Sequence, residues 1–181
     1  MDSCRKAKLG FCLSLLLTLV SSQAQEAQPS EYQLKAAFLF HFAKFVEWPP
    51  TAFEADTSPM VIGVLGQNPF GADLEQTIRN KTINNHGFVI KEFRSAAEAT
   101  NCHVLFISSS ESERLSEVIE QLHGTSVLTV SETARFIEAG GMINFVPEGN
   151  KIRFQINNEA AKRAKLKISS KLLSLATPTT K

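Results

Sequence analysis

The sequence is poor in cysteine, and this limits how the chain can be cross-linked. It holds Cys4, Cys12 and Cys102, and the first two lie in an N-terminal segment that we expect to be removed. Only Cys102 then remains, so no disulfide can form within the exported chain. We interpret Cys102 as a small buried side chain at the start of a strand. An intermolecular disulfide is the alternative.

Histidine is also scarce, and its spacing matches no metal site. The four histidines are scattered at His41, His86, His103 and His123. Cys102 and His103 are adjacent, and neighbouring residues of a strand point to opposite faces. His41 falls on the apolar side of a predicted helix, where we expect a core histidine rather than a ligand. The sequence therefore predicts neither a metal ion nor a cofactor.

Motifs for catalysis are missing as well. Ser108, Ser109 and Ser110 follow a predicted strand, but they lack the Gly-x-Ser-x-Gly turn that exposes a nucleophilic serine. The glycines at 63, 66 and 71 match neither the dinucleotide-binding nor the Walker spacing. We expect turn and capping roles for both groups, no catalytic residue, and a protein that is not an enzyme.

The chain has no excess of charge of either sign. Of its 19 basic and 18 acidic residues, three basic and one acidic residue lie before Gln25, so the remainder is close to neutral. Binding to nucleic acid requires a concentrated basic face that neutralises phosphates. The balance argues against a nucleic-acid partner.

Only one long apolar run is present, and it lies at the N-terminus. Residues 9–20 follow a basic start and precede Ser22-Gln23-Ala24, an arrangement typical of a secretory signal peptide. We expect cleavage after Ala24, and a mature chain that does not insert into a membrane, because a span needs ~20 apolar residues. A retained N-terminal anchor is the alternative.

The first element of the mature chain is a predicted helix over residues 32–48. Helical spacing places an apolar side on it, and Ser30 is a suitable N-cap. Pro49 and Pro50 end the helix. Phe40 falls on the opposite side, where it is either a lone exposed aromatic residue or part of a partner surface. The apolar side comprises Leu34, Phe38, His41, Phe42, Phe45 and Trp48, with Leu39 and Val46 beside it.

Beyond this helix, short apolar runs alternate with helical patterns. Such alternation predicts a mostly parallel sheet with helices on both faces, and a hairpin around Pro147-Glu148-Gly149-Asn150 makes the sheet mixed. We expect one three-layer α/β domain over residues 25–181, with five to six strands and a frayed tail from about residue 177. The predicted strands are 61–65, 88–93, 104–107, 126–130, 142–146 and 151–157; the predicted helices are 72–78, 111–122, 132–139, 158–164 and 171–176.

Two segments resemble the YfiR family of small exported proteins. The first is KAAFLFHFAKFVEWP at residues 35–49. The second begins with INF at 143–145 and continues through IRFQIN at 152–157 to ISSKLLSLA at 168–176. The resemblance extends over essentially the whole mature chain. It implies a periplasmic repressor that binds the periplasmic domain of an inner-membrane diguanylate cyclase, which lowers cyclic di-GMP and biofilm formation.

The resemblance also implies a homodimer, in some members with intramolecular disulfides, which a chain holding Cys102 alone cannot form. We expect the regulatory surface near the C-terminal segment. Its candidate residues are Glu159, Lys162, Arg163, Ile168 and Lys171, with Phe40 as a further candidate. Ile168 is assigned equally to partner contact and to core, whereas Leu172 and Leu173 are assigned to the core.

Other functions remain compatible with the residues. A periplasmic module that binds a small molecule is the main alternative, because open α/β sheets hold ligands at the carboxyl ends of their strands. A structural envelope protein is a second. A hydrolase that uses residues 108–110 or a histidine is a third.

Overall fold

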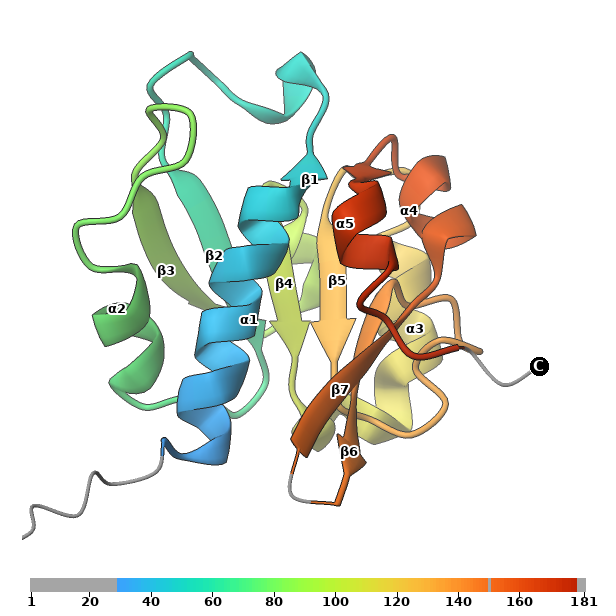
Figure 1. Ribbon diagram of the computed structural model, residues 1–181. Helices are drawn as coiled ribbons and strands as arrows, with labels where there is room; N and C mark the ends of the chain where they lie inside the picture. Colours follow the sequence, from blue (N-terminus) through green and yellow to red (C-terminus); the bar gives the residue numbers. More distant parts are fainter. Residues whose placement is uncertain (1–28, 150, 179–181) are drawn as a thin grey trace, which may run out of the picture.

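A six-stranded sheet forms the centre of the molecule in a computed structural model that describes residues 29–149 and 151–178 (Figure 1). The strand order is β3-β2-β4-β5-β6-β7, parallel except for β7, which pairs antiparallel with β6. The predicted mixed α/β sheet is confirmed. The expected signal segment 1–24 lies outside the residues that the structure describes. The strands are β2 Met60–Leu65, β3 Phe88–Phe93, β4 Val104–Ile107, β5 Leu128–Ser131, β6 Ile143–Glu148 and β7 Lys151–Ile156.

Helices cover both faces of the sheet, as predicted (Figure 1). One face packs against α1 Glu31–Phe45, α2 Asp73–Ile78, α4 Asn158–Arg163 and α5 Ser170–Leu173. The other face packs against α3 Leu115–Gln121 and the short 3-10 helix η2 Ala96–Ala99. Strands β4 and β5 are buried along their whole length, as expected for parallel strands covered on both sides. None of the described helices is long and apolar enough to cross a membrane.

Helix α1 begins as predicted but ends three residues early. Ser30 caps it, and a reciprocal bond from the Ser30 amide to Gln33 completes a capping box. Val46 and Glu47 leave the helix and form β1, which pairs antiparallel with β8 Lys167–Ile168. A pairing between residues so distant in sequence gives no local signal, so the predicted end at Trp48 was wrong.

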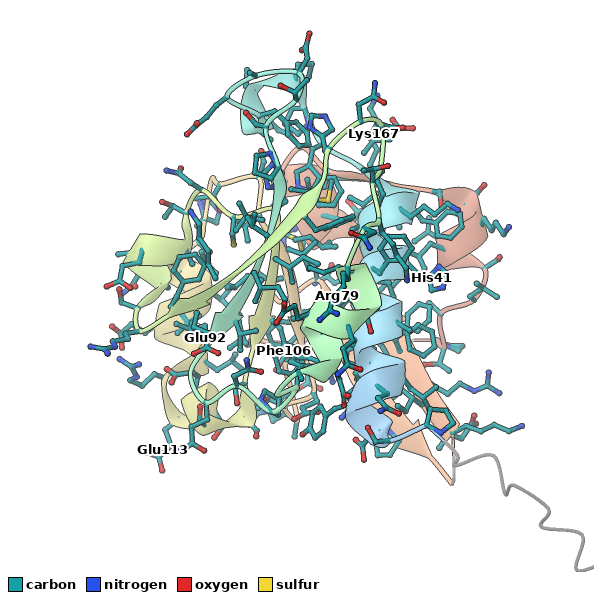
Figure 2. The ribbon with its side chains drawn as sticks, turned by 90° about the vertical axis from the view of Figure 1, so that its left-hand side faces the viewer. His41, Arg79, Glu92, Phe106, Glu113 and Lys167 are labelled. Carbon is teal, nitrogen blue, oxygen red and sulfur yellow. The ribbon has the colours of Figure 1, made fainter. Side chains whose placement is uncertain are left out.

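The buried side of α1 is rotated from the predicted one. Its buried residues are Lys35, Ala36, Leu39, Phe42 and Ala43. Leu34 is 38% exposed. His41 is exposed on the outer side of the helix (Figure 2), so the expected core histidine was wrong. The predicted side did not include Lys35, which ion pairs with Glu31 and Glu132 allow to be buried.

Two further segments differ from expectation. Residues 134–140 form consecutive turns instead of the predicted helix over 132–139, and Arg135 has a φ of 62°, which a right-handed helix does not accommodate. Pro147 lies within β6 opposite Ile152, not in the hairpin turn. At this position β6 has no partner on its other side among the described residues, and proline is tolerated on such a free edge.

The C-terminal segment is tied to the sheet at several points. Asn157 caps α4 by accepting from the Ala160 amide at 3.0 Å, and Ser169 caps α5. Thr177, where we expected fraying to begin, donates its amide to the Phe154 carbonyl at 2.9 Å. The segment that carries most of the candidate interface residues is therefore held rigidly.

Candidate functional site

Three of the predicted interface residues lie on the outer side of α4. Glu159, Lys162 and Arg163 are all exposed, while Ala160 and Ala161 on the opposite side are buried against the core. The Lys162 ammonium lies 2.7 Å from the Glu159 carboxylate. This hydrogen bond and the Lys162 charge lower the pKa of the Glu159 carboxyl.

Ile168 and Lys171 continue this surface beyond α4. Ile168 is half-buried in β8 opposite Val46, so it contributes to the core and also presents an exposed part. The Lys171 ammonium lies 5.4 Å from the centre of the Phe45 ring. The Ser169 amide donates to the Phe45 carbonyl at 2.9 Å, which fixes the surface to the end of α1. We call Glu159, Lys162, Arg163, Ile168 and Lys171 the C-terminal surface.

The C-terminal surface is basic. Between residues 158 and 171 the chain has one acidic side chain, Glu159, and five basic ones, all of them exposed: Lys162, Arg163, Lys165, Lys167 and Lys171. The near-neutral chain therefore carries a local excess of positive charge. Such a patch favours a partner surface of negative charge.

Phe40 does not belong to the C-terminal surface. Its ring lies 5.7 Å from that of Phe88, and the Lys81 ammonium lies 4.4 Å from the Phe40 ring centre. Phe40 is thus half-buried on the side of α1 that faces α2 and β3, whereas α4 and α5 lie on the other side (Figure 1). The expectation that Phe40 points away from the core was wrong, because the loop before β3 covers it.

His103 is a buried side chain with a hydrogen bond at one ring nitrogen. Its Nδ1 accepts from the Val61 amide at 3.0 Å, and the Phe53 ring stacks between His103 and His86 at 4.4 and 4.1 Å. Burial lowers the pKa of His103 to about 4, partly opposed by the Ala52 carbonyl and reinforced by His86. No group of three potential metal-binding side chains was found in residues 29–149 and 151–178.

The serines at 108–110 lie at the place where open α/β sheets commonly bind ligands. The strand order reverses between β2 and β4, and the crevice at such a reversal is the usual site. Here Ser110 Oγ accepts from the Gln67 amide at 3.0 Å. Gly66 has a φ of 88°, and a side chain there would overlap Ser110 and Glu111. Ser110 and Glu111 therefore pack closely against the Gly66–Gln67 turn at this crevice.

A cavity that the sequence did not reveal lies beside this crevice. It has a volume of about 700 Å³ and is bounded by the first turn of α1, the residues after β4 and β5, and the β6–β7 hairpin. In its wall the buried Lys35 ammonium pairs with Glu31 and Glu132, and Tyr32 donates to Glu132 at 3.0 Å. No sequence signal pointed to Lys35, because the predicted apolar side of the helix did not include it.

Cys102 is 4% exposed, and burial raises the pKa of its thiol to about 12. Because only the thiolate reacts readily, we expect thiol reagents to label Cys102 only after unfolding. Labelling of the native protein and of its C102S variant, followed by mass spectrometry, measures this difference. Equal labelling of the two native proteins is expected. A dimer on a non-reducing gel that disappears in C102S would contradict the buried assignment.

Comparison with known proteins places the chain in a family. No curated protein matches it significantly. The model of the YfiR/HmsC-like family matches residues 32–177, which include α1, the whole sheet and the C-terminal surface. The family consists of regulators rather than enzymes, which act with diguanylate cyclases in cyclic di-GMP signalling. Since the match extends over most of the chain, this protein belongs to the YfiR/HmsC-like family.

Proposed function

We propose that this protein is a periplasmic repressor of an inner-membrane diguanylate cyclase. After export through a signal peptide cleaved at Ala24, it binds the periplasmic sensor domain of the cyclase, in our proposal as a homodimer. Binding favours the inactive state of the cyclase, because a ligand shifts an equilibrium by its difference in affinity for the two states. Cyclic di-GMP and biofilm formation then fall.

The observation that carries this proposal is the family match over residues 32–177. Both segments that carry the family resemblance meet in space, since β1 at the end of α1 pairs with β8. A protein outside the cytoplasm can influence a cytoplasmic reaction only through a partner that spans the membrane. The family and the compartment together favour a membrane-bound cyclase as that partner.

The C-terminal surface is the part of the molecule that we propose contacts the cyclase. It is exposed and basic, it includes the partly exposed apolar Ile168, and hydrogen bonds hold it to α1 and β7. A rigid surface loses little conformational entropy on binding. Its charge requires an acidic partner face, so we expect binding to weaken as the salt concentration rises.

Reversal of one charge on this surface tests the proposal. K171E should fold normally, because exposed substitutions usually change stability by about 0.5 kcal/mol or less. It should bind the cyclase sensor domain about three- to tenfold more weakly, because it places a negative charge against an acidic partner face. Calorimetry on the purified domains measures the affinity, and cyclic di-GMP in a complemented deletion strain should rise.

Two variants complete this experiment. K91E reverses an exposed lysine on β3, at the opposite edge of the sheet, and should bind like the wild type. E159K removes the acidic group of this basic surface and should bind an acidic partner face more tightly, without unfolding the protein. Wild-type affinity in both K171E and E159K would move the interface away from the C-terminal surface, and Phe40 would be examined next.

A further inference from the structure

The cavity between α1 and the β6–β7 hairpin has the size and position of a ligand site. Its volume of about 700 Å³ lies within the ~300–1,000 Å³ that small-molecule sites occupy. The carboxyl ends of the parallel strands, the first turn of α1 and the end of β6 all lie at the same end of the molecule (Figure 1). This is the end at which open α/β sheets bind ligands.

A buried ammonium group lies in the cavity wall. The Lys35 side chain is 5% exposed, and its Nζ is bonded to the carboxylates of Glu31 and Glu132. Burial lowers the pKa of Lys35, but the hydrogen bonds and charges of Glu132 and Glu31 outweigh this effect and raise it. Lys35 therefore stays protonated and needs anionic partners in any state of the protein.

The two carboxylates that serve Lys35 differ in how firmly they are held. Glu132 has a side chain that is 15% exposed and also accepts a hydrogen bond from the Tyr32 hydroxyl. Glu31 has a side chain that is 63% exposed, and among the described residues its carboxylate bonds to Lys35 alone. The Glu31 side chain can turn into water, but the buried Lys35 charge then needs a replacement anion, whereas Glu132 is held by two hydrogen bonds. One anionic position on Lys35 is thus exchangeable.

Apolar side chains line one part of the cavity, and the polar residues Ser109 and Lys151 line it as well. Phe145, Val146, Pro147 and Ile152 line it from the hairpin. Leu34 lies at its edge and is one of the large apolar side chains that the described part of the chain leaves exposed. A ligand that covers Leu34 would remove this apolar surface from water, which is favourable.

We propose that this cavity binds a small carboxylate that has an apolar body. The ligand carboxylate replaces that of Glu31 on the Lys35 ammonium, so the charge around Lys35 is unchanged, and the apolar body lies along Leu34 and the hairpin residues. The site lies outside the C-terminal surface and does not depend on the cyclase being the partner.

Three probes of equal chain length separate this proposal from its alternatives. Hexanoate, hexanol and hexylamine should be titrated into the purified protein by calorimetry. Of these three probes, hexanoate should bind most tightly. Octanoate, a longer carboxylate, should bind more tightly than hexanoate by about fourfold for each added methylene that is buried. Hexanol binding as tightly as hexanoate would show an apolar pocket that does not recognise the carboxylate. Preference for hexylamine would overturn the assignment of Lys35, as would no binding of any probe at millimolar concentration.

Two variants assign the carboxylate contact. K35M should weaken hexanoate binding by about tenfold or more while leaving hexanol binding unchanged, because the charge-assisted hydrogen bond can no longer form. E31Q should bind hexanoate about twofold more tightly than the wild type, because the competing carboxylate is removed. K44M changes an exposed lysine in the last turn of α1, and E47Q changes an exposed glutamate in β1; both should bind like the wild type.

A third variant keeps the proposal testable if K35M does not fold. L34A alters an exposed residue and should fold normally. It should weaken hexanoate binding by about fourfold for each ligand methylene that Leu34 no longer shields from water. Wild-type affinity in both L34A and E31Q would place the ligand elsewhere and overturn the proposal.

Discussion

Replacement of Phe42 by alanine is expected to lower the free energy of unfolding by about 3–5 kcal/mol, the usual cost of removing a buried phenylalanine. Phe42 is fully buried in the last turn of α1. Its ring lies 5.9, 5.7 and 5.1 Å from those of Phe38, Phe145 and Phe154. The substitution therefore leaves a cavity against both strands of the hairpin, and urea unfolding followed by circular dichroism measures the fall in stability.

A matched substitution on the same helix serves as the control. Phe45 is half-buried near the C-terminal end of α1, so F45A should be destabilised clearly less than F42A, because a side chain already in contact with water leaves a smaller cavity. The comparison tests the rotation of the helix, since the sequence pattern placed both residues on one apolar side. Equal destabilisation of F42A and F45A would contradict the structure and favour that pattern.

The sheet could be predicted because its signals are local. Val104–Ile107 is uniformly apolar, and the strand is buried on both faces. In the hairpin, Ile152, Phe154 and Ile156 alternate with polar residues, which is the pattern of a strand with one wet face. Strand β7 follows this pattern in part, with Phe154 buried and Lys151 and Arg153 exposed. Alternation of such strands with helices leaves few possible topologies.

The parts that could not be predicted depend on contacts between distant residues. Lys35 looks like a surface residue until Glu132 is brought beside it from almost a hundred residues away. Helix α1 ends before Val46, because Val46 pairs with Ile168 as part of a short antiparallel sheet. The turns at residues 134–140 include Arg135 in a left-handed conformation, which the helical pattern of that segment did not reveal.

Part of the candidate site could likewise be predicted from local sequence, and part of it could not. Five of the predicted interface residues lie on the consecutive elements α4, β8 and α5, because they are close together in the sequence. Phe40 came from a different segment, and its assignment relied on a helix orientation that was wrong. The cavity around Lys35 was missed because four separate parts of the chain build it.

Acidification is expected to destabilise the protein through His103. The pKa of a histidine in the unfolded chain is about 6.5, and burial lowers the pKa of His103 in the folded protein to about 4. Between these values the unfolded chain binds a proton that the folded protein does not, so stability falls as the pH drops from about 6.5 to about 4. Above this range the contribution is constant, and below it no further loss arises from His103.

The expected loss through His103 is about 3 kcal/mol over this range. Substitution by asparagine tests it, because Asn Oδ1 can accept from the Val61 amide as His103 Nδ1 does at 3.0 Å, while asparagine does not titrate. The free energy of unfolding of H103N, measured in urea from pH 7 to 4, should fall by about 3 kcal/mol less than that of the wild type. H123Q replaces a solvent-exposed histidine and should follow the wild-type curve. If the prediction holds, H103N loses less stability on acidification than the wild type. An equal loss would mean that His103 is protonated in the folded protein, and that its packing against Phe53 does not exclude the proton.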